Sequence, residues 1–168
     1  MITGTLWGAT EAERDDPLPC DELEPAGLQA DRAISIAAPP TVVYSWLCQL
    51  RVAPYSYDLL DNWGRRSPRV RDPHLTELEV GQEFMSVFRL DSFVLGRHIT
   101  LVSGRIAVTY AVRPEGAGTR LAVRARFGTP PIVDRLLAFG DVFMTRKQLL
   151  TLRELAEAEA RRTVTGPQ

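Results

Sequence analysis

Alternation of apolar and polar side chains predicts two strands between residues 105 and 128. In the first strand, 105–113, one face is apolar and consists of Ile106, Val108, Tyr110 and Val112. The second strand, 119–128, repeats this period and alternates its apolar residues with Arg120, Arg124 and Arg126. The segment PEGAG between them is a strong hairpin signal. We therefore expect two half-buried antiparallel strands whose arginines lie on a solvated face.

Three shorter segments, 32–38, 84–90 and 97–102, also have the pattern of strands. The first ends before a pair of prolines, and the third lies between two turns that contain glycine. In the second, alternate apolar side chains share one face, which predicts a single strand containing Phe84, Phe88 and Leu90.

Helical spacing occurs in two regions. The segment PPTVVYSWLCQL starts at a proline and predicts a short helix, and 55–62 is long enough for one or two further turns. From Pro131 to Arg161 apolar residues recur at helical intervals, which predicts a long helix with a candidate kink at Gly140-Asp141. Such a helix needs a sheet to lie on. We expect an irregular N-terminal arm at 1–28 packed on one domain, 29–162, and a disordered tail at 163–168.

Composition narrows the class of protein. The chain has 168 residues and a formal net charge of −1, so nothing favours binding to nucleic acid or to an anionic membrane. Two cysteines cannot form a disulfide framework, and two histidines without ligand spacing predict no metal site. No dinucleotide fingerprint or phosphate-binding glycine loop is present, so no cofactor is expected. We see no signal peptide and no membrane span, because Pro39-Pro40 divides the uncharged run 33–50. A cytoplasmic protein is therefore expected.

Four segments carry a resemblance to a known family. ISIAAPPTVVYSWL, YSYDLLDN, GRHITL and FGDVFMTRKQLLTLRELAE are similar to segments of the START-like, or SRPBCC, superfamily, near its bacterial polyketide cyclase/dehydrase-like and uncharacterised members. The resemblance covers roughly residues 29 to 160. It implies an α+β helix-grip fold, in which a curved antiparallel sheet wraps around a long C-terminal helix and two short helices follow the first strand.

The resemblance also implies an internal cavity that binds a small, mainly hydrophobic molecule, lipid-like or polyketide-like. One alternative is a cyclase or dehydratase that uses acid/base residues at the cavity mouth. A second alternative is a non-catalytic regulatory or structural partner with a collapsed cavity. The sequence favours binding, because no convergent set of acid/base residues stands out. The sequence is compatible with either a monomer or a homodimer.

The segment YSYD supplies the first candidate site residues. By the same resemblance, Tyr55, Tyr57 and Asp58 lie at the cavity mouth and form a polar lip for a ligand's oxygen atoms, with Tyr57 and Asp58 as catalytic candidates. In the simpler interpretation both tyrosines only pack and Asp58 pairs with an arginine outside the cavity. His98 is a third catalytic candidate. It could shuttle a proton from the inner face of its strand and would be inert on the outer face, and a shift of one residue in register decides between the two.

Aromatic residues are the candidates for the cavity lining. Most aromatic side chains belong to the core, and the sequence does not show which of them line a void. The predicted ligand-binding set, beyond Tyr57 and Asp58, is Trp46, Tyr55, Trp63, Phe84, Phe88, Tyr110, Phe127 and Phe143.

Overall fold

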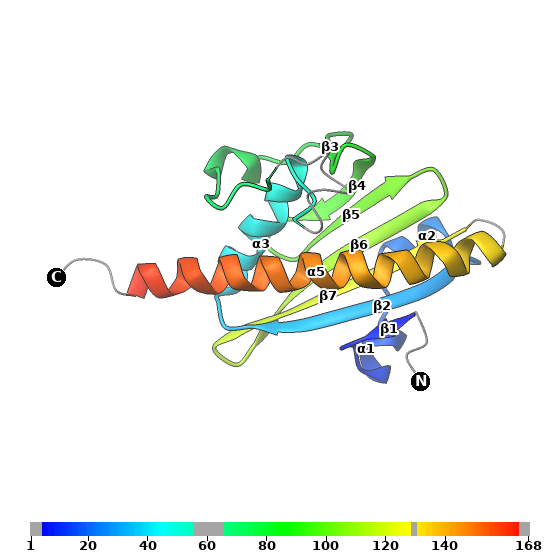
Figure 1. Ribbon diagram of the computed structural model, residues 1–168, viewed down its shortest axis with the longest axis horizontal. Coiled ribbons are helices and arrows are strands. Elements are labelled where there is room, and N and C mark those ends of the chain that lie inside the picture. Colours follow the sequence, from blue (N-terminus) through cyan, green and yellow to red (C-terminus); the bar gives the residue numbers. More distant parts are fainter. Residues whose placement is uncertain (1–4, 56–65, 129–130, 165–168) are drawn as a thin grey trace.

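The computed structural model of the protein describes residues 5–55, 66–128 and 131–164, with the backbone alone for 131–143. Within these residues, seven strands form one curved sheet whose inner face packs on a long helix (Figure 1). The strands are β1 (Leu6–Trp7), β2 (Leu28–Ile36), β3 (Glu83–Phe84), β4 (Phe88–Val94), β5 (His98–Ser103), β6 (Ile106–Glu115) and β7 (Gly118–Phe127). The helices are α1 (Glu11–Asp15), α2 (Cys20–Leu23), α3 (Pro40–Cys48) and α5 (Pro131–Val164), with 3-10 turns η1 (Gln49–Arg51) and η2 (Pro73–Thr76).

The sheet has the order β1-β2-β7-β6-β5-β4-β3, and every pairing except the parallel pair β1–β2 is antiparallel. Strands β6 and β7 form the predicted hairpin, in which Tyr110 lies opposite Val123 and Val112 opposite Leu121. Because side chains alternate along a strand, this register puts the predicted apolar residues of both strands on one face. That face is the inner face of the sheet.

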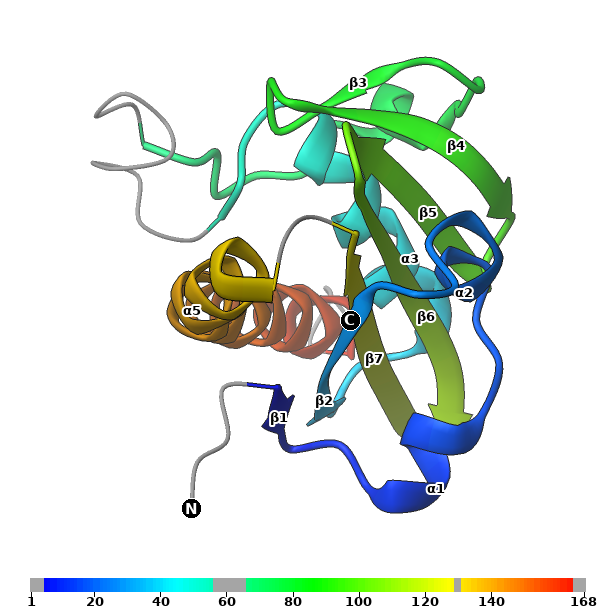
Figure 2. The same ribbon diagram turned by 90° about the vertical axis from the view of Figure 1, so that its right-hand side faces the viewer.

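Helix α5 covers the inner face, and α3 packs beside it (Figure 2). α5 continues without interruption through Gly140-Asp141, so the candidate kink does not divide it. Pro40 begins α3, where the missing N–H of proline costs no helical hydrogen bond. The core lies between these layers and includes Leu90, Ile99, Leu101, Val108, Leu121, Val123, Leu149, Leu152 and Leu155. The chain therefore has the expected α+β helix-grip fold; the second short helix predicted at 55–62 falls almost wholly outside the described residues.

The prediction of one strand at 84–90 is wrong, because the chain reverses inside it. β3 ends at Phe84 and β4 begins at Phe88, and the two phenylalanines pair across a tight hairpin. Met85 and Ser86 make the turn with φ of 50° and 63°, a left-handed conformation that non-glycine residues seldom adopt. Phe84, Phe88 and Leu90 still share the inner face. The turn contains no glycine or proline, so the usual sequence signal was absent.

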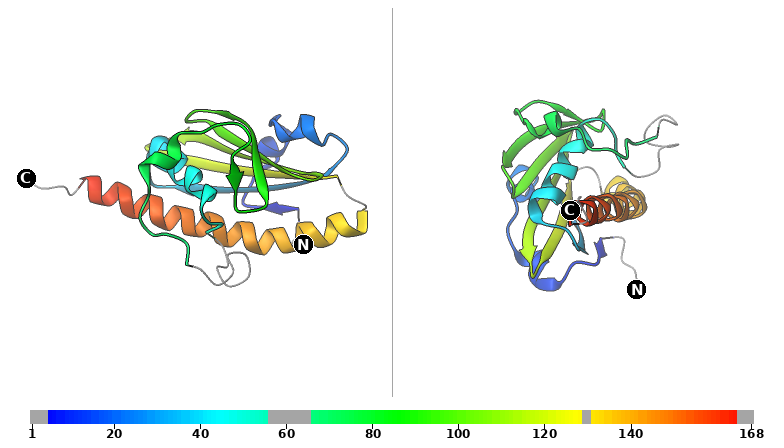
Figure 3. Two further views of the ribbon diagram at one scale, coloured as in Figure 1. Left: turned by 90° about the horizontal axis from the view of Figure 1, so that it is seen from above. Right: turned by 90° about the vertical axis from the view of Figure 1, so that its left-hand side faces the viewer.

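The outer face of the sheet also differs from expectation. Arg120, Arg124 and Arg126 alternate on β7 as predicted, but residues 5–27 cover them instead of solvent. Arg124 keeps 2% of its side chain exposed, and the other two arginines keep 18% and 11%. Helices α1 and α2 lie on the side of the sheet opposite to α5 (Figures 2 and 3). This N-terminal arm contains β1, α1 and α2.

No helix in the described residues is both long enough and apolar enough to cross a lipid bilayer.

Candidate functional site

A hydrogen-bonded polar group lies inside the apolar layer between the sheet and α5. Gln148 of α5 is 4% exposed, and its Oε1 accepts a 2.8 Å hydrogen bond from the hydroxyl of Tyr110 on β6. Its Nε2 donates to the carbonyl of Pro54 at 2.6 Å and to Sδ of Met85 at 3.4 Å. One amide thus connects the helix with β6, with the chain after η1 and with the β3–β4 hairpin.

The helical period places Gln148 in this position. Residues three or four apart share a face of a helix, and Thr145, Gln148 and Thr151 are all buried on the same face of α5 as Leu152. The hydroxyl of Thr151 donates to the carbonyl of Lys147 in its own helix. The inward face of α5 therefore carries neutral polar groups among leucines.

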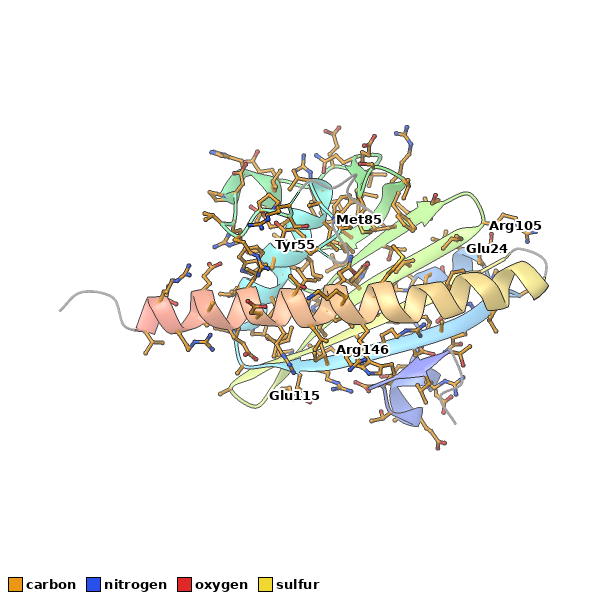
Figure 4. The ribbon with its side chains drawn as sticks, viewed as in Figure 1. Glu24, Tyr55, Met85, Arg105, Glu115 and Arg146 are labelled. Atoms are coloured by element: carbon orange, nitrogen blue, oxygen red, sulfur yellow. The ribbon has the colours of Figure 1, made fainter. Side chains whose placement is uncertain are left out.

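Backbone strain gathers at the contacts of Gln148. Tyr55, next to Pro54, has φ of 55°, and Met85 and Ser86 have the positive φ values of the hairpin turn. Figure 4 shows Tyr55 and Met85 on the same side of α5, near its middle. Such conformations cost about 1–3 kcal/mol each and persist only where the surroundings hold them. In proteins they concentrate at binding sites and at segments that switch, which makes this a candidate site.

Trp46, a predicted ligand-binding residue, is held by contacts within the protein. It is 2% exposed on α3, and its Nε1 donates to Oε2 of Glu159 at 2.9 Å. Arg71 donates to both oxygens of the same carboxylate. These hydrogen bonds from Arg71 are the main reason that the pKa of Glu159 lies below its ordinary value. Trp46 also meets the ring of Tyr55 edge-on, with ring centres 6.0 Å apart. It therefore fixes α3 and Tyr55 against α5.

Tyr55 is the described member of the predicted polar lip. It is 1% exposed, and its backbone N–H donates to Oγ of Ser67 at 3.3 Å, which brings residues 55 and 67 together. Tyr57, Asp58 and Trp63 lie outside the described residues, as does the side chain of Phe143. The polar lip therefore stays a prediction.

The other predicted aromatic residues all contact the core. Phe84, Tyr110 and Phe127 are buried, and Phe88 is half-buried against them. Phe84 and Tyr110 belong to the elements that meet at Gln148, whereas Phe127 lies at the far end of β7, opposite Leu28 and Ile106. The structure thus brings Tyr55, Phe84 and Tyr110 to one region, and Phe127 to another. Contact with a ligand remains a prediction for all of them.

His98 points away from this region. It pairs with Ala111 on β6, in the register that puts its neighbour Ile99 on the inner face opposite Tyr110. His98 is therefore on the outer face, where burial lowers its pKa. Its Nδ1 has no hydrogen-bond partner among the described residues. Of the two alternative positions for His98, the structure shows the outer one.

Gln148 and Arg32 are buried polar residues on the inner side that sequence reasoning missed. Arg32 lies on β2 opposite Val123, is 1% exposed, and donates to the backbone carbonyls of Thr5 and Asp31. A signal existed for both. Arg32 has the same parity as the apolar residues of its strand, and Gln148 is four residues before Leu152 on the buried stripe of the helix.

Two further observations concern other kinds of site. The described residues contain no group of three His, Cys, Asp or Glu side chains that could hold a metal ion. A polar surface cleft lies between the N-terminal arm and β2 and is lined by Glu11, Arg14, Asp15 and Gln29. Nothing in it belongs to the predicted site.

Comparison with known proteins identifies the fold and nothing finer. No protein-family model matches the chain, and no curated protein matches it. Among solved structures, protein SSP2350 from Staphylococcus saprophyticus is 12% identical with a TM-score of 0.55, and covers 79% of this chain and 94% of its own. MLL2253 from Mesorhizobium loti is 18% identical with a TM-score of 0.52, and covers 78% of this chain and 98% of its own.

NE0264 from Nitrosomonas europaea has a TM-score of 0.52 and 16% identity, over 86% of this chain and 99% of its own. All three are structural-genomics proteins from bacteria. At such low identities the likeness shows that the chain shares their fold.

Proposed function

We propose that the protein binds a small, mainly hydrophobic molecule between the inner face of the sheet and α5, as the START-like superfamily it resembles would imply. The observation that carries the proposal is the neutral hydrogen-bonded pair of Tyr110 and Gln148, buried in a mainly apolar layer. Binding sites for small molecules are mostly apolar and contain a few fixed polar groups that orient the ligand. The polar groups here are held in place by hydrogen bonds to three different elements.

The described residues favour binding over acid/base catalysis. His98, one of the three catalytic candidates, lies on the outer face. Tyr57 and Asp58 lie outside the described residues, and the polar groups that contact Gln148 are a phenol hydroxyl, a backbone carbonyl and a thioether. None of these is a carboxylate or an imidazole, the side chains most often used for acid/base catalysis. A cyclase or dehydratase would need its acid or base from the predicted lip.

Fluorescence of a neutral lipophilic dye, N-phenylnaphthylamine, tests the proposal. We expect the dye to become brighter in the presence of the native protein, to saturate at one site per chain, and to be displaced by lipophilic competitors. Native mass spectrometry of the freshly purified protein should also show a bound lipophile that is lost on denaturation. If the dye neither binds nor is displaced and the mass is that of the chain alone, the interior is closed and the protein is a structural or regulatory partner.

A further inference from the structure

The orientation of the Gln148 amide follows from its partners. The carbonyl of Pro54 can only accept a hydrogen bond, so the atom of the amide that faces it at 2.6 Å must be Nε2. The opposite atom is then Oε1, which accepts from the hydroxyl of Tyr110 at 2.8 Å. The carbonyl of Pro54 thereby fixes the orientation of the amide, Tyr110 holds its oxygen, and both N–H groups point toward Pro54 and the hairpin turn.

The two N–H groups of Gln148 have acceptors of unequal strength. One donates to the carbonyl of Pro54, which is a strong acceptor. The other faces Sδ of Met85 at 3.4 Å, and a thioether sulfur is a weak acceptor. Because Gln148 is 4% exposed, bulk solvent has little access to this weak contact. An oxygen acceptor at the position of the sulfur would form a better hydrogen bond.

Met85 is placed so that it can give way to such an acceptor. Its side chain is flexible and half-buried, and it belongs to the strained turn between β3 and β4. β3 is two residues long and forms the edge of the sheet, and Val87 in the same turn is 66% exposed. Movement of this turn leaves the pairing of β5, β6 and β7 intact.

We propose that Gln148 is the specificity residue of the interior and selects lipophiles that carry a carbonyl oxygen, such as ketones and esters. The carbonyl oxygen replaces Sδ of Met85 as the acceptor of the second Nε2–H, and Tyr110 holds the amide for it. The hydrogen-bond partners of Gln148 among the described residues are all uncharged, which favours a neutral carbonyl over a carboxylate. This inference rests on the proposed function, because it requires that a lipophile enters between the sheet and α5.

Paired ligands that differ in one carbonyl group test the inference. Displacement of N-phenylnaphthylamine by methyl pentyl ketone and by heptane is measured at matched aqueous activities. We expect the wild-type protein to prefer the ketone by about fivefold, the value of one hydrogen bond improved in a buried site. Gln148→Leu should bind heptane as before and lose the preference.

For Met85→Leu we expect the opposite change in the preference for the ketone, for an independent reason. Leucine keeps nearly the volume of methionine but removes the acceptor, so the second Nε2–H has only the ligand's oxygen as a partner. The preference for the ketone should rise above that of the wild type. Thr151→Val is the matched control, since it removes a buried hydroxyl from the same face of α5 that donates to the carbonyl of Lys147 rather than to Gln148, and should leave the preference unchanged.

The outcomes separate the two proposals. A wild-type protein that binds neither dye nor ligand overturns the proposed function and the inference with it. Binding of both ligands with the same preference in the wild type, Gln148→Leu and Met85→Leu overturns only the role of Gln148. If Gln148→Leu fails to fold, as judged by its thermal transition, Met85→Leu decides alone, and a ratio unchanged from the wild type contradicts the inference.

Discussion

At the scale of single residues, Arg124 shows how this protein accommodates a charge beneath its N-terminal arm. All five guanidinium N–H groups have acceptors, which are the carboxylates of Asp21 and Asp31 and the backbone carbonyls of Glu13, Arg14 and Asp16. Burying an arginine is costly unless each donor is satisfied. The sheet supplies one of these partners and the arm supplies the others, so Arg124 holds the arm against the sheet.

Replacement of Arg124 should therefore be far more harmful than loss of an exposed ion pair. Arg124→Ala leaves the carboxylate of Asp31 buried without its closest cation, and we expect the free energy of unfolding to fall by about 3–5 kcal/mol. The control is Arg113→Ala, which removes an exposed pair with Asp16 and should cost less than about 1 kcal/mol. Urea unfolding of both variants measures the difference. Equal losses would mean that docking of the arm does not depend on Arg124.

At the scale of elements, α1 is too short to be stable by itself, and its contacts hold it in place. Glu13 forms a capping box with Thr10, in which each side chain accepts a hydrogen bond from the other residue's backbone N–H. The same carboxylate accepts two hydrogen bonds from the guanidinium of Arg120 on β7. One residue thus caps the helix and attaches it to the sheet.

This attachment should be sensitive to acid. The hydrogen bond from Arg120 is the largest cause that lowers the pKa of Glu13 from 4.5 to about 2. A lowered carboxyl pKa adds stability that is complete above the unfolded value and is lost as the pH falls through the folded value. Glu13→Gln should reduce the free energy of unfolding at neutral pH and flatten its decline between about pH 4.5 and about pH 2.

The control for this experiment is Glu11→Gln, which neutralises an exposed carboxyl group on the same helix. Its unfolding free energy should follow the wild-type pH dependence. Chemical denaturation at a series of pH values compares the three proteins. If Glu13→Gln keeps the wild-type slope of unfolding free energy against pH, other carboxylates cause the acid sensitivity.

At the scale of the whole molecule, stability should vary across the sheet in the order of its strands. β7 is paired on both sides, with β2 and β6, along its length. The β3–β4 hairpin lies at the edge, is short, and contains the strained turn. Amides paired in the centre of a sheet exchange with solvent only through global unfolding, whereas edge segments open locally.

Hydrogen exchange should show this gradient. We expect the amides of Leu121 and Val123 to exchange at the rate set by global unfolding, and those of residues 84–88 to exchange much faster. Addition of a bound lipophile should slow exchange in the hairpin more than in β7, because the hairpin contacts Gln148. Uniform protection of both regions would show that the hairpin does not open independently.

The periodic parts of the sequence were sufficient to predict the sheet centre and the long helix. In β6 and β7 the alternation of apolar residues matches the register, and α5 follows its helical spacing. The turn at Met85 was missed because its residues are not typical of a turn, and contacts with distant residues such as Leu50 and Gln148 help to hold it. Local patterns carry no information about such partners.

The site was predicted less completely for the same reason. Alternation assigned Arg124 to the outer face correctly but could not show that residues about a hundred positions earlier would cover it. Whether His98 lies on the inner or the outer face depended on the strand register, and a shift of one residue in that register would reverse the face. Gln148 carries no motif, and its importance follows only from Tyr110, Pro54 and Met85, which come from separate parts of the chain.

The pairing of β2 with β7 has a consequence for synthesis of the chain. β2 leaves the ribosome long before β7, its partner from Leu28 opposite Phe127 to Ile36 opposite Thr119. At about 5–20 residues per second, it waits on the order of several seconds with one edge and its apolar side chains unpaired. Asp31 and Arg32, which are costly to bury in the finished protein, interrupt the apolar run during this interval. Charges within an unpaired strand oppose aggregation, so we expect these two residues to protect the nascent chain until β7 pairs with β2.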